Sequence, residues 1–208
     1  MATIQQSPSP VQRARLISNL LHPWLIMIPV VSLAAYETAG ESLQWLNWTF
    51  MTLASAFLLP SLYARIRASM LSGGRPRQRI SRSLFRDNLW DLIVMAALFG
   101  IPPVLVLYYL DGPVTLLAIV VAVSVTMLSV ALANLVYRAS FHLAMVTSML
   151  SSLWILFGLV SLAALPLLPV LGISRYQLGE HSPAQIATGF FIGLAVSVAV
   201  FFGFGLIG

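Results

Sequence analysis

The sequence has no cysteine and no lysine, and only 8% of its 208 residues are charged. The absence of cysteine excludes disulfide bonds and thiolate chemistry. The three histidines and six carboxylates are scattered along the chain, whereas a metal cage needs its ligands in a cluster. We therefore expect no metal site in this protein.

Hydrophobic side chains make up 59% of the sequence, and the mean hydropathy is +0.93. A soluble globule of this composition would have far too little polar surface, which indicates an integral membrane protein. A helical span needs roughly 20 residues, so the chain has room for about six or seven crossings. We predict an all-α, polytopic membrane helical bundle of six to seven helices, with a cytoplasmic tail at residues 1–16 and a single membrane-embedded domain at residues 17–208.

Apolar runs and turn residues place the expected helices. The stretch 143–173 is too long for one crossing, and Gly158 near its middle, with Pro166 and Pro169 beyond, predicts two short helices packed as a hairpin. The other helices are expected at residues 20–36, 46–64, 89–110, 113–137 and 183–208.

All 11 basic residues are arginines, and threading these helices through a bilayer places every one on the side of the N-terminus. The opposite face has Glu37, Glu41 and Asp111 and no basic residue. Because cytoplasmic loops concentrate basic residues, we expect a multi-pass protein of the cell inner membrane whose N-terminus and active-site face are cytoplasmic. Topology alone accounts for five of the arginines, namely Arg13, Arg15, Arg65, Arg77 and Arg86.

The formal charge of +5 and the pI near 10.2 raise the question of a nucleic-acid partner. Such a partner needs a folded soluble surface on which basic and aromatic side chains alternate, and this chain has none in its sequence pattern. We expect membrane lipids with anionic headgroups as partners and no nucleic acid.

Polar residues gather where two helices are expected to begin. Arg138, Ser140 and His142 fall within five residues at the start of the hairpin. Arg175 and His181 precede the last helix, for which Ser182 and Pro183 fit the N-cap and first positions. Helix N-termini bind anions, and histidine is suited both to attack phosphorus and to protonate a leaving oxygen. The pattern predicts a phosphate pocket on the arginine-bearing face.

These residues resemble the motifs of the type 2 phosphatidic acid phosphatases, over roughly residues 67–202. That family's third motif is Ser-Arg, five residues, His, three residues, Asp, and this chain has Ser174-Arg175, His181 and Gln185 at that spacing. The second motif, Pro-Ser-Gly-His, is matched by Ala139-Ser140-Phe141-His142. For the first motif, which ends in Arg-Pro, Arg67 and Arg79 are the preferred pair, with Arg75 as the alternative.

The resemblance implies a membrane lipid phosphatase that hydrolyses a lipid phosphate or an isoprenyl diphosphate through a phosphohistidine, with no cofactor. It assigns His181 as the nucleophile and His142 as the general acid. It also implies four phosphate ligands, with Gln185 supporting His181: Arg67, Arg79, Ser140 and Arg175.

Two departures from the motifs favour a second hypothesis. Phe141 replaces a glycine that lets the backbone approach phosphate, and Gln185 replaces the carboxylate that would balance the charge of the histidine. The alternative is a catalytically inactive, phosphatase-like protein that acts as a lipid-binding or structural subunit of a membrane complex. A small transporter receives little support, because no span has a buried ion pair or a clear internal repeat in sequence.

Several further residues have two readings from sequence. Gln185 also completes a capping box with Ser182, and Glu180 is a possible substitute carboxylate for His181. Asp87 and Asp91 are expected to serve the positive end of a helix and neighbouring arginines. His22 is expected to be an interfacial residue. The Gly189 and Gly193 spacing allows close helix packing either inside one bundle or between copies of a homo-oligomer.

Overall fold

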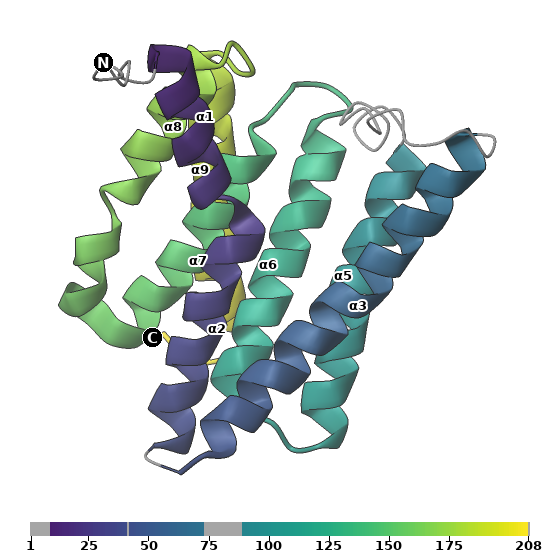
Figure 1. The fold of residues 1–208 in the computed structure, drawn as a ribbon. Coiled ribbons are helices and arrows are strands. Elements are labelled where there is room, and N and C mark those ends of the chain that lie inside the picture. The colour runs from purple at the N-terminus through teal and green to yellow at the C-terminus, as the bar shows by residue number, and fades with distance from the viewer. Residues whose placement is uncertain (1–8, 41, 73–88, 208) are drawn as a thin grey trace, which may run out of the picture.

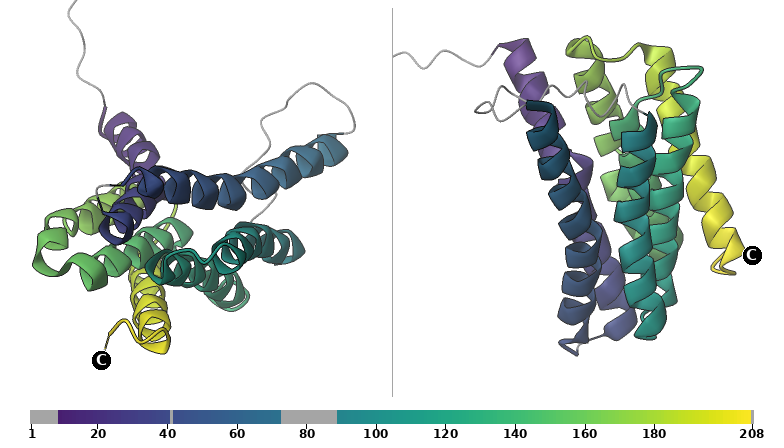
Figure 2. Two further views of the ribbon diagram at one scale, coloured as in Figure 1. Left: turned by 90° about the horizontal axis from the view of Figure 1, so that it is seen from below. Right: turned by 90° about the vertical axis from the view of Figure 1, so that its right-hand side faces the viewer.

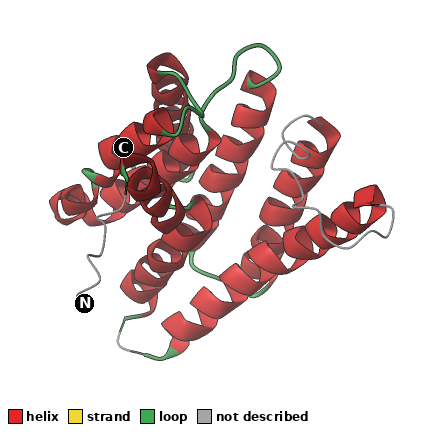
Figure 3. Ribbon diagram, turned by 45° about the horizontal axis from the view of Figure 1, so that its top comes forward, coloured by secondary structure: helices red, strands yellow, loops and turns green. Residues whose placement is uncertain are grey.

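The computed structural model describes residues 9–40, 42–72 and 89–207, and all regular secondary structure in these ranges is helical. Figure 3 shows helices joined by loops across this part of the chain. Six helical segments in it are long and apolar enough to cross a membrane. The predicted all-α polytopic membrane bundle is confirmed.

The helices follow one another up and down the bundle (Figure 1). Most lie within a few residues of the predicted spans, although the helix predicted at 46–64 continues to Ser72. The end of the predicted tail also forms a short helix. In chain order they are α1 (Pro10–Leu20), α2 (Pro23–Ala39), α3 (Gln44–Ser72), α5 (Leu89–Tyr109), α6 (Val114–Ala133), α7 (Phe141–Phe157), the 3₁₀ helix η1 (Gly158–Ala164), α8 (Leu167–Gln177) and α9 (Pro183–Gly203).

Helix α1 forms because its first turn is fully capped. The Ser9 side chain accepts from the Gln12 amide, the Gln12 side chain accepts from the Ser9 amide, and Pro10 occupies the first helical position. The helix ends at Leu20, and α2 starts after His22, whose Nδ1 accepts from the Trp24 amide at 3.4 Å. The chain therefore enters the bundle through two successive capped helices.

The predicted hairpin is formed by α7, η1 and α8. Gly158 ends α7 with φ of +58°, a conformation that favours glycine, and η1 carries the chain to α8. Helix α8 has 11 residues, or about 16 Å at 1.5 Å per residue, which is too short to cross a bilayer. In Figure 1 the chain descends along α7 and returns along α8 to the end from which it started.

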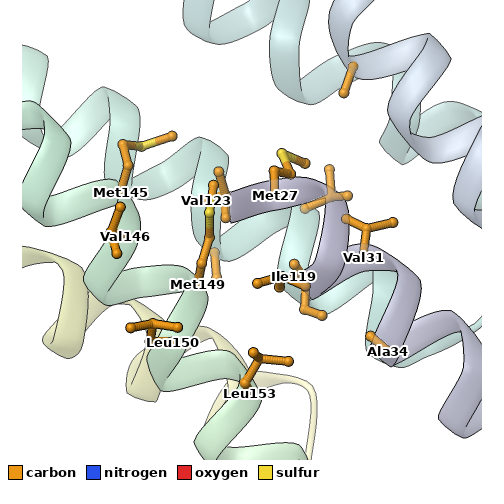
Figure 4. Packing of buried hydrophobic residues seen from close by; sticks show 14 of the residues in the cluster. Met27, Val31, Ala34, Ile119, Val123, Met145, Val146, Met149, Leu150 and Leu153 are labelled. Atoms are coloured by element: carbon orange, nitrogen blue, oxygen red, sulfur yellow. The ribbon is translucent and has the colours of Figure 1, made fainter. Parts of the chain in front are cut away.

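The core is built around α6 and α7, the most buried of the candidate spans. Met145 and Met149 of α7 pack with Ile119 and Val123 of α6 and with Met27 of α2 (Figure 4). These side chains are fully buried, so α7 sits at the centre of the bundle and its first turn is held firmly in place.

Helix α9 packs against α7 through small residues. A Cβ added to Gly189 would lie 2.5 Å from the carbonyl oxygen of Ser140, and one added to Gly193 would overlap the carbonyl oxygen of Ala144. Further along the same stripe, the hydroxyls of Ser148 and Ser197 lie 2.8 Å apart. The small-residue spacing that the sequence left open is used inside the bundle, where it brings two backbones into contact.

The described arginines lie at one end of the bundle. Figures 1 and 2 place α1, the end of α3, the α6–α7 loop and the end of α8 together there. These segments contain Arg13 and Arg15, Arg65 and Arg67, Arg138, and Arg175. Glu37 and Asp111 are near the opposite end, as predicted. The remaining arginines, at positions 75, 77, 79, 82 and 86, lie outside the described residues, as do Glu41 and Asp87.

The α7–α9 contact predicts a sharp difference between two glycines of the same helix. Gly193→Ala places a methyl group on the α7 backbone and should destabilise the protein by about 1–3 kcal/mol. Gly203→Ala meets nothing within 4 Å and should leave stability unchanged or slightly raised. Thermal unfolding of both variants in detergent measures the difference, and equal melting temperatures would contradict the packing.

Candidate functional site

The first turns of α7 and α9 are joined directly. The amide of Ser140, the N-cap residue of α7, donates to the carbonyl oxygen of Gln185 at 3.0 Å. His142 lies two residues after Ser140, and His181 lies four residues before Gln185. The structure thus brings together the two segments that carry the second and third predicted motifs.

Gln185 makes both of the contacts that the sequence suggested. Its side-chain oxygen accepts from the Ser182 amide at 3.0 Å, and the Ser182 hydroxyl accepts from the Gln185 amide at 3.3 Å, so the capping box is confirmed. The same oxygen lies 3.4 Å from Nδ1 of His181. The sequence alternatives for Gln185 are therefore compatible in one conformation.

This arrangement assigns the tautomer of His181. The Gln185 oxygen already accepts a backbone N–H, which fixes which end of the amide faces the ring. An oxygen has no proton to give, so Nδ1 of His181 is the donor in that contact. In a neutral ring with its proton on Nδ1, the lone pair is on Nε2, the nitrogen that a nucleophilic histidine needs.

Ser140 is fully buried, and its hydroxyl makes no hydrogen bond with any residue in the described ranges. As the N-cap of α7 it would normally accept from an amide of the first turn, but its side chain does not do so. A buried hydroxyl in this state costs about 1–3 kcal/mol. A ligand oxygen that reached this hydroxyl, which has no exposed surface, would recover this free energy and meet the positive end of the helix.

Arg175 is buried at the end of α8, with 6% of its surface exposed. Its Nη1 donates to the hydroxyl of Ser18 in α1 at 2.9 Å, and its Nη2 forms an ion pair with Glu180 in the loop before α9. Glu180, the possible substitute carboxylate for His181, is thus engaged by Arg175. The guanidinium ties α1, α8 and the α8–α9 loop together next to His181.

Phe141, which stands where the family has glycine, lies in the first turn of α7. Its ring is half-buried and packs against the hydrophobic core, 6.2 Å from the ring of His142 between centroids. The Phe141 side chain therefore packs partly into the bundle interior.

His22 lies beside His142, a contact that its sequence context did not indicate. Its ring meets that of His142 edge to face, with 4.9 Å between centroids and an interplanar angle of 87°. The position of His22 before Pro23 is a readable helix-start signal, and His22 does cap α2. Its contact with His142 depends on how α2 packs against α7, which no local pattern reveals.

Arg67 has a different environment from the other predicted ligands. Its Nε donates to Asp91 of α5 at 3.0 and 3.2 Å, and the Tyr63 hydroxyl donates to the same carboxylate at 2.5 Å. The α3–α5 pair lies across the bundle from α8 (Figure 2). The structure therefore does not bring Arg67 to Arg175, whereas the predicted pairing of Asp91 with a neighbouring arginine is confirmed. Arg79 and Arg75 lie outside the described residues.

Within the described ranges, no group of three or more histidine and carboxylate residues is placed to hold a metal ion. The chain matches no family model, no curated protein and no solved structure. The functional argument accordingly rests on the motifs and on the geometry of the α7–α9 junction.

The placement of Arg67 predicts a structural role for it. Arg67→Leu removes a cation from a carboxylate that is 4% exposed, and it should destabilise the protein by about 1–3 kcal/mol. Arg65→Leu, two residues away and exposed, should have little effect. Thermal unfolding in detergent distinguishes them, and restoration of the melting temperature in Arg67→Leu with Asp91→Leu would identify the ion pair as the cause.

Proposed function

We propose that this protein is an integral membrane lipid phosphatase that hydrolyses a lipid phosphate or an isoprenyl diphosphate through a phosphohistidine. The observation that carries the proposal is the junction of α7 and α9. A buried hydroxyl without a partner among the described residues, that of Ser140, lies at a helix start bonded to the segment that orients His181. A phosphate oxygen would satisfy that hydroxyl, and the adjacent histidine supplies a nucleophile.

In the proposed reaction, Nε2 of His181 attacks phosphorus while the bond to the lipid oxygen breaks. His142 gives its proton to the leaving oxygen and becomes the base that removes a proton from water. The water oxygen then attacks the phosphohistidine, the P–N bond breaks, and inorganic phosphate and the free histidine are released. Gln185 keeps the proton on Nδ1 throughout, which holds the reactive lone pair toward phosphorus.

The negative charge of the phosphoryl group is stabilised by the N-termini of α7 and α9 and by Arg175. Arg175 is already paired with Glu180, so the phosphate displaces this carboxylate from the guanidinium as it binds. Glu180 is suited to such an exchange, because its side chain is 34% exposed and can turn to water.

The alternative is a catalytically inactive, lipid-binding or structural subunit of a membrane complex. Two observations favour it: Gln185, at the position of the motif's aspartate, is a neutral amide, and Arg175 forms an ion pair within the protein. In a serine protease triad the comparable loss of a carboxylate costs roughly 10⁴-fold in turnover. An anion-binding bundle without catalysis would retain the same junction.

The decisive measurement is phosphate release by the purified protein in detergent, with phosphatidic acid and farnesyl diphosphate as substrates and EDTA present. Release above background is expected from the wild type and none from His181→Ala, because the nucleophile is lost. Equal release from both proteins would exclude the phosphohistidine. No release from folded wild type would favour the inactive subunit.

Gln185→Glu tests the effect of placing a carboxylate beside His181. Glutamate reaches the same atoms, so it preserves the capping box, and its carboxylate stabilises the imidazolium of His181. We expect phosphate release to rise by about tenfold or more, a fraction of the ~10⁴-fold effect of a triad carboxylate. Gln185→Leu, which removes both hydrogen bonds, is the control and should lower release. A decrease in Gln185→Glu would contradict the proposed tautomer.

We propose that the protein lies in the cell inner membrane with the arginine-bearing end in the cytoplasm, where anionic headgroups and basic residues meet. Since the chain has no cysteine, a single introduced thiol is unique. Val136→Cys in the α6–α7 loop should resist a membrane-impermeant maleimide on intact spheroplasts, while Leu110→Cys at the other end should react. The reverse pattern would overturn the orientation.

A further inference from the structure

An apolar groove runs between α8 and α9 at the arginine-bearing end of the bundle. Its volume is about 510 Å³, within the range of roughly 300–1,000 Å³ that is common for small-molecule sites. We infer that this α8–α9 groove binds one hydrocarbon chain of a phosphate-bearing lipid whose headgroup lies at the α7–α9 junction. This inference rests on the proposed function, since it assigns the chain of the same substrate.

The lining of the groove is suited to hydrocarbon. Every lining side chain except the tyrosine is apolar, and Pro183 has no amide hydrogen to expose. Gly172 has no side chain to fill the groove, and a Cβ added there would lie 3.3 Å from the Ile186 side chain. The lining residues are Leu143 of α7, Leu168, Pro169, Gly172, Ile173 and Tyr176 of α8, and Pro183, Ile186, Ala187 and Phe190 of α9.

The order of these residues gives the groove a direction. Helices α8 and α9 run antiparallel, so Tyr176 and Pro183 lie at the arginine-bearing end, and Leu168 and Phe190 lie deeper. Tyr176 follows Arg175 in the chain, and Pro183 is two residues from His181. A lipid with its phosphate beside His181 would therefore lay its chain along the groove, toward the turn of the hairpin.

Charge and size both favour a lipid chain over a helix of another protein. The end of the groove adjoins the end of the bundle that holds all six described arginines, which is complementary to an anionic headgroup. A volume near 510 Å³ is about that of one turn of helix roughly 11 Å across with a pitch of about 5.4 Å. A partner helix would bury too little surface there, whereas a single alkyl or prenyl chain fits lengthwise.

The test uses phosphatidic acid with a diazirine in one acyl chain, photolysed in phosphatidylcholine nanodiscs. All proteins carry His181→Ala, so that turnover does not remove the phosphate. Ala187→Phe fills the groove, and Ala195→Phe is the matched control, because it makes the same change at an exposed position of α9 that does not line the groove. Unlabelled phosphatidic acid and unlabelled diacylglycerol are the competitors.

We expect peptide mapping to place the label on groove residues, with a decrease of at least tenfold in Ala187→Phe and no change in Ala195→Phe. Phosphatidic acid should compete and diacylglycerol should not. Label spread evenly over the lipid-facing surface, or equal competition by diacylglycerol, would overturn the inference and indicate ordinary surrounding lipid. A dimer in native mass spectrometry that Ala187→Phe abolishes would overturn it in favour of a second copy.

This experiment is independent of catalysis. If wild type releases no phosphate but the groove is labelled in a headgroup-dependent way, the chain site stands and the phosphatase proposal fails. If wild type releases phosphate but the label avoids the groove, the phosphatase proposal stands and the chain lies elsewhere. Equal melting temperatures of the Ala187→Phe and Ala195→Phe proteins establish that both are folded.

Discussion

The close contact of α7 with α9 is the constraint on which the candidate site depends. Because Gly189 and Gly193 have no side chains, the α9 backbone reaches the carbonyl oxygens of Ser140 and Ala144. Only at this separation can the Ser140 amide bond to the carbonyl oxygen of Gln185. Since Gln185 also orients His181, the small residues determine the geometry of a site to which they contribute no functional group.

The two ion pairs at this end of the bundle differ in which partner is buried. Asp91 is 3% exposed and accepts from both Arg67 and Tyr63, so this cluster joins α3 to α5 around a buried carboxylate. In the other pair the guanidinium of Arg175 is buried, while Glu180 is partly open to water. A bound anion can replace an exposed carboxylate at lower cost than a buried one, because the displaced group regains its hydration.

Sequence reasoning succeeded where the signal was local. The apolar runs located the spans, the glycine at position 158 located the hairpin break, and Ser182, Pro183 and Gln185 located the start of α9. It missed α1, because this helix is polar and is stabilised by its Ser9 cap rather than marked by an apolar run. It also missed His22 beside His142, and it could not separate Arg67 from Arg175, because these depend on which helices pack together. Spacing along the chain identifies residue types for a site, whereas packing decides which of them meet.

Gln185 links the stability of α9 to the chemistry of His181 through one oxygen atom. The capping box needs an acceptor for the Ser182 amide, and the amide of glutamine or the carboxylate of glutamate supplies it equally well. The aspartate of the motif that this sequence resembles is one methylene shorter than the glutamine or glutamate that a capping box uses at this position. The chain satisfies the cap with a neutral group, which lies beside the histidine ring and adds no negative charge there. In the proposed reaction, the helix termini and the phosphate itself offset the positive charge that His181 acquires.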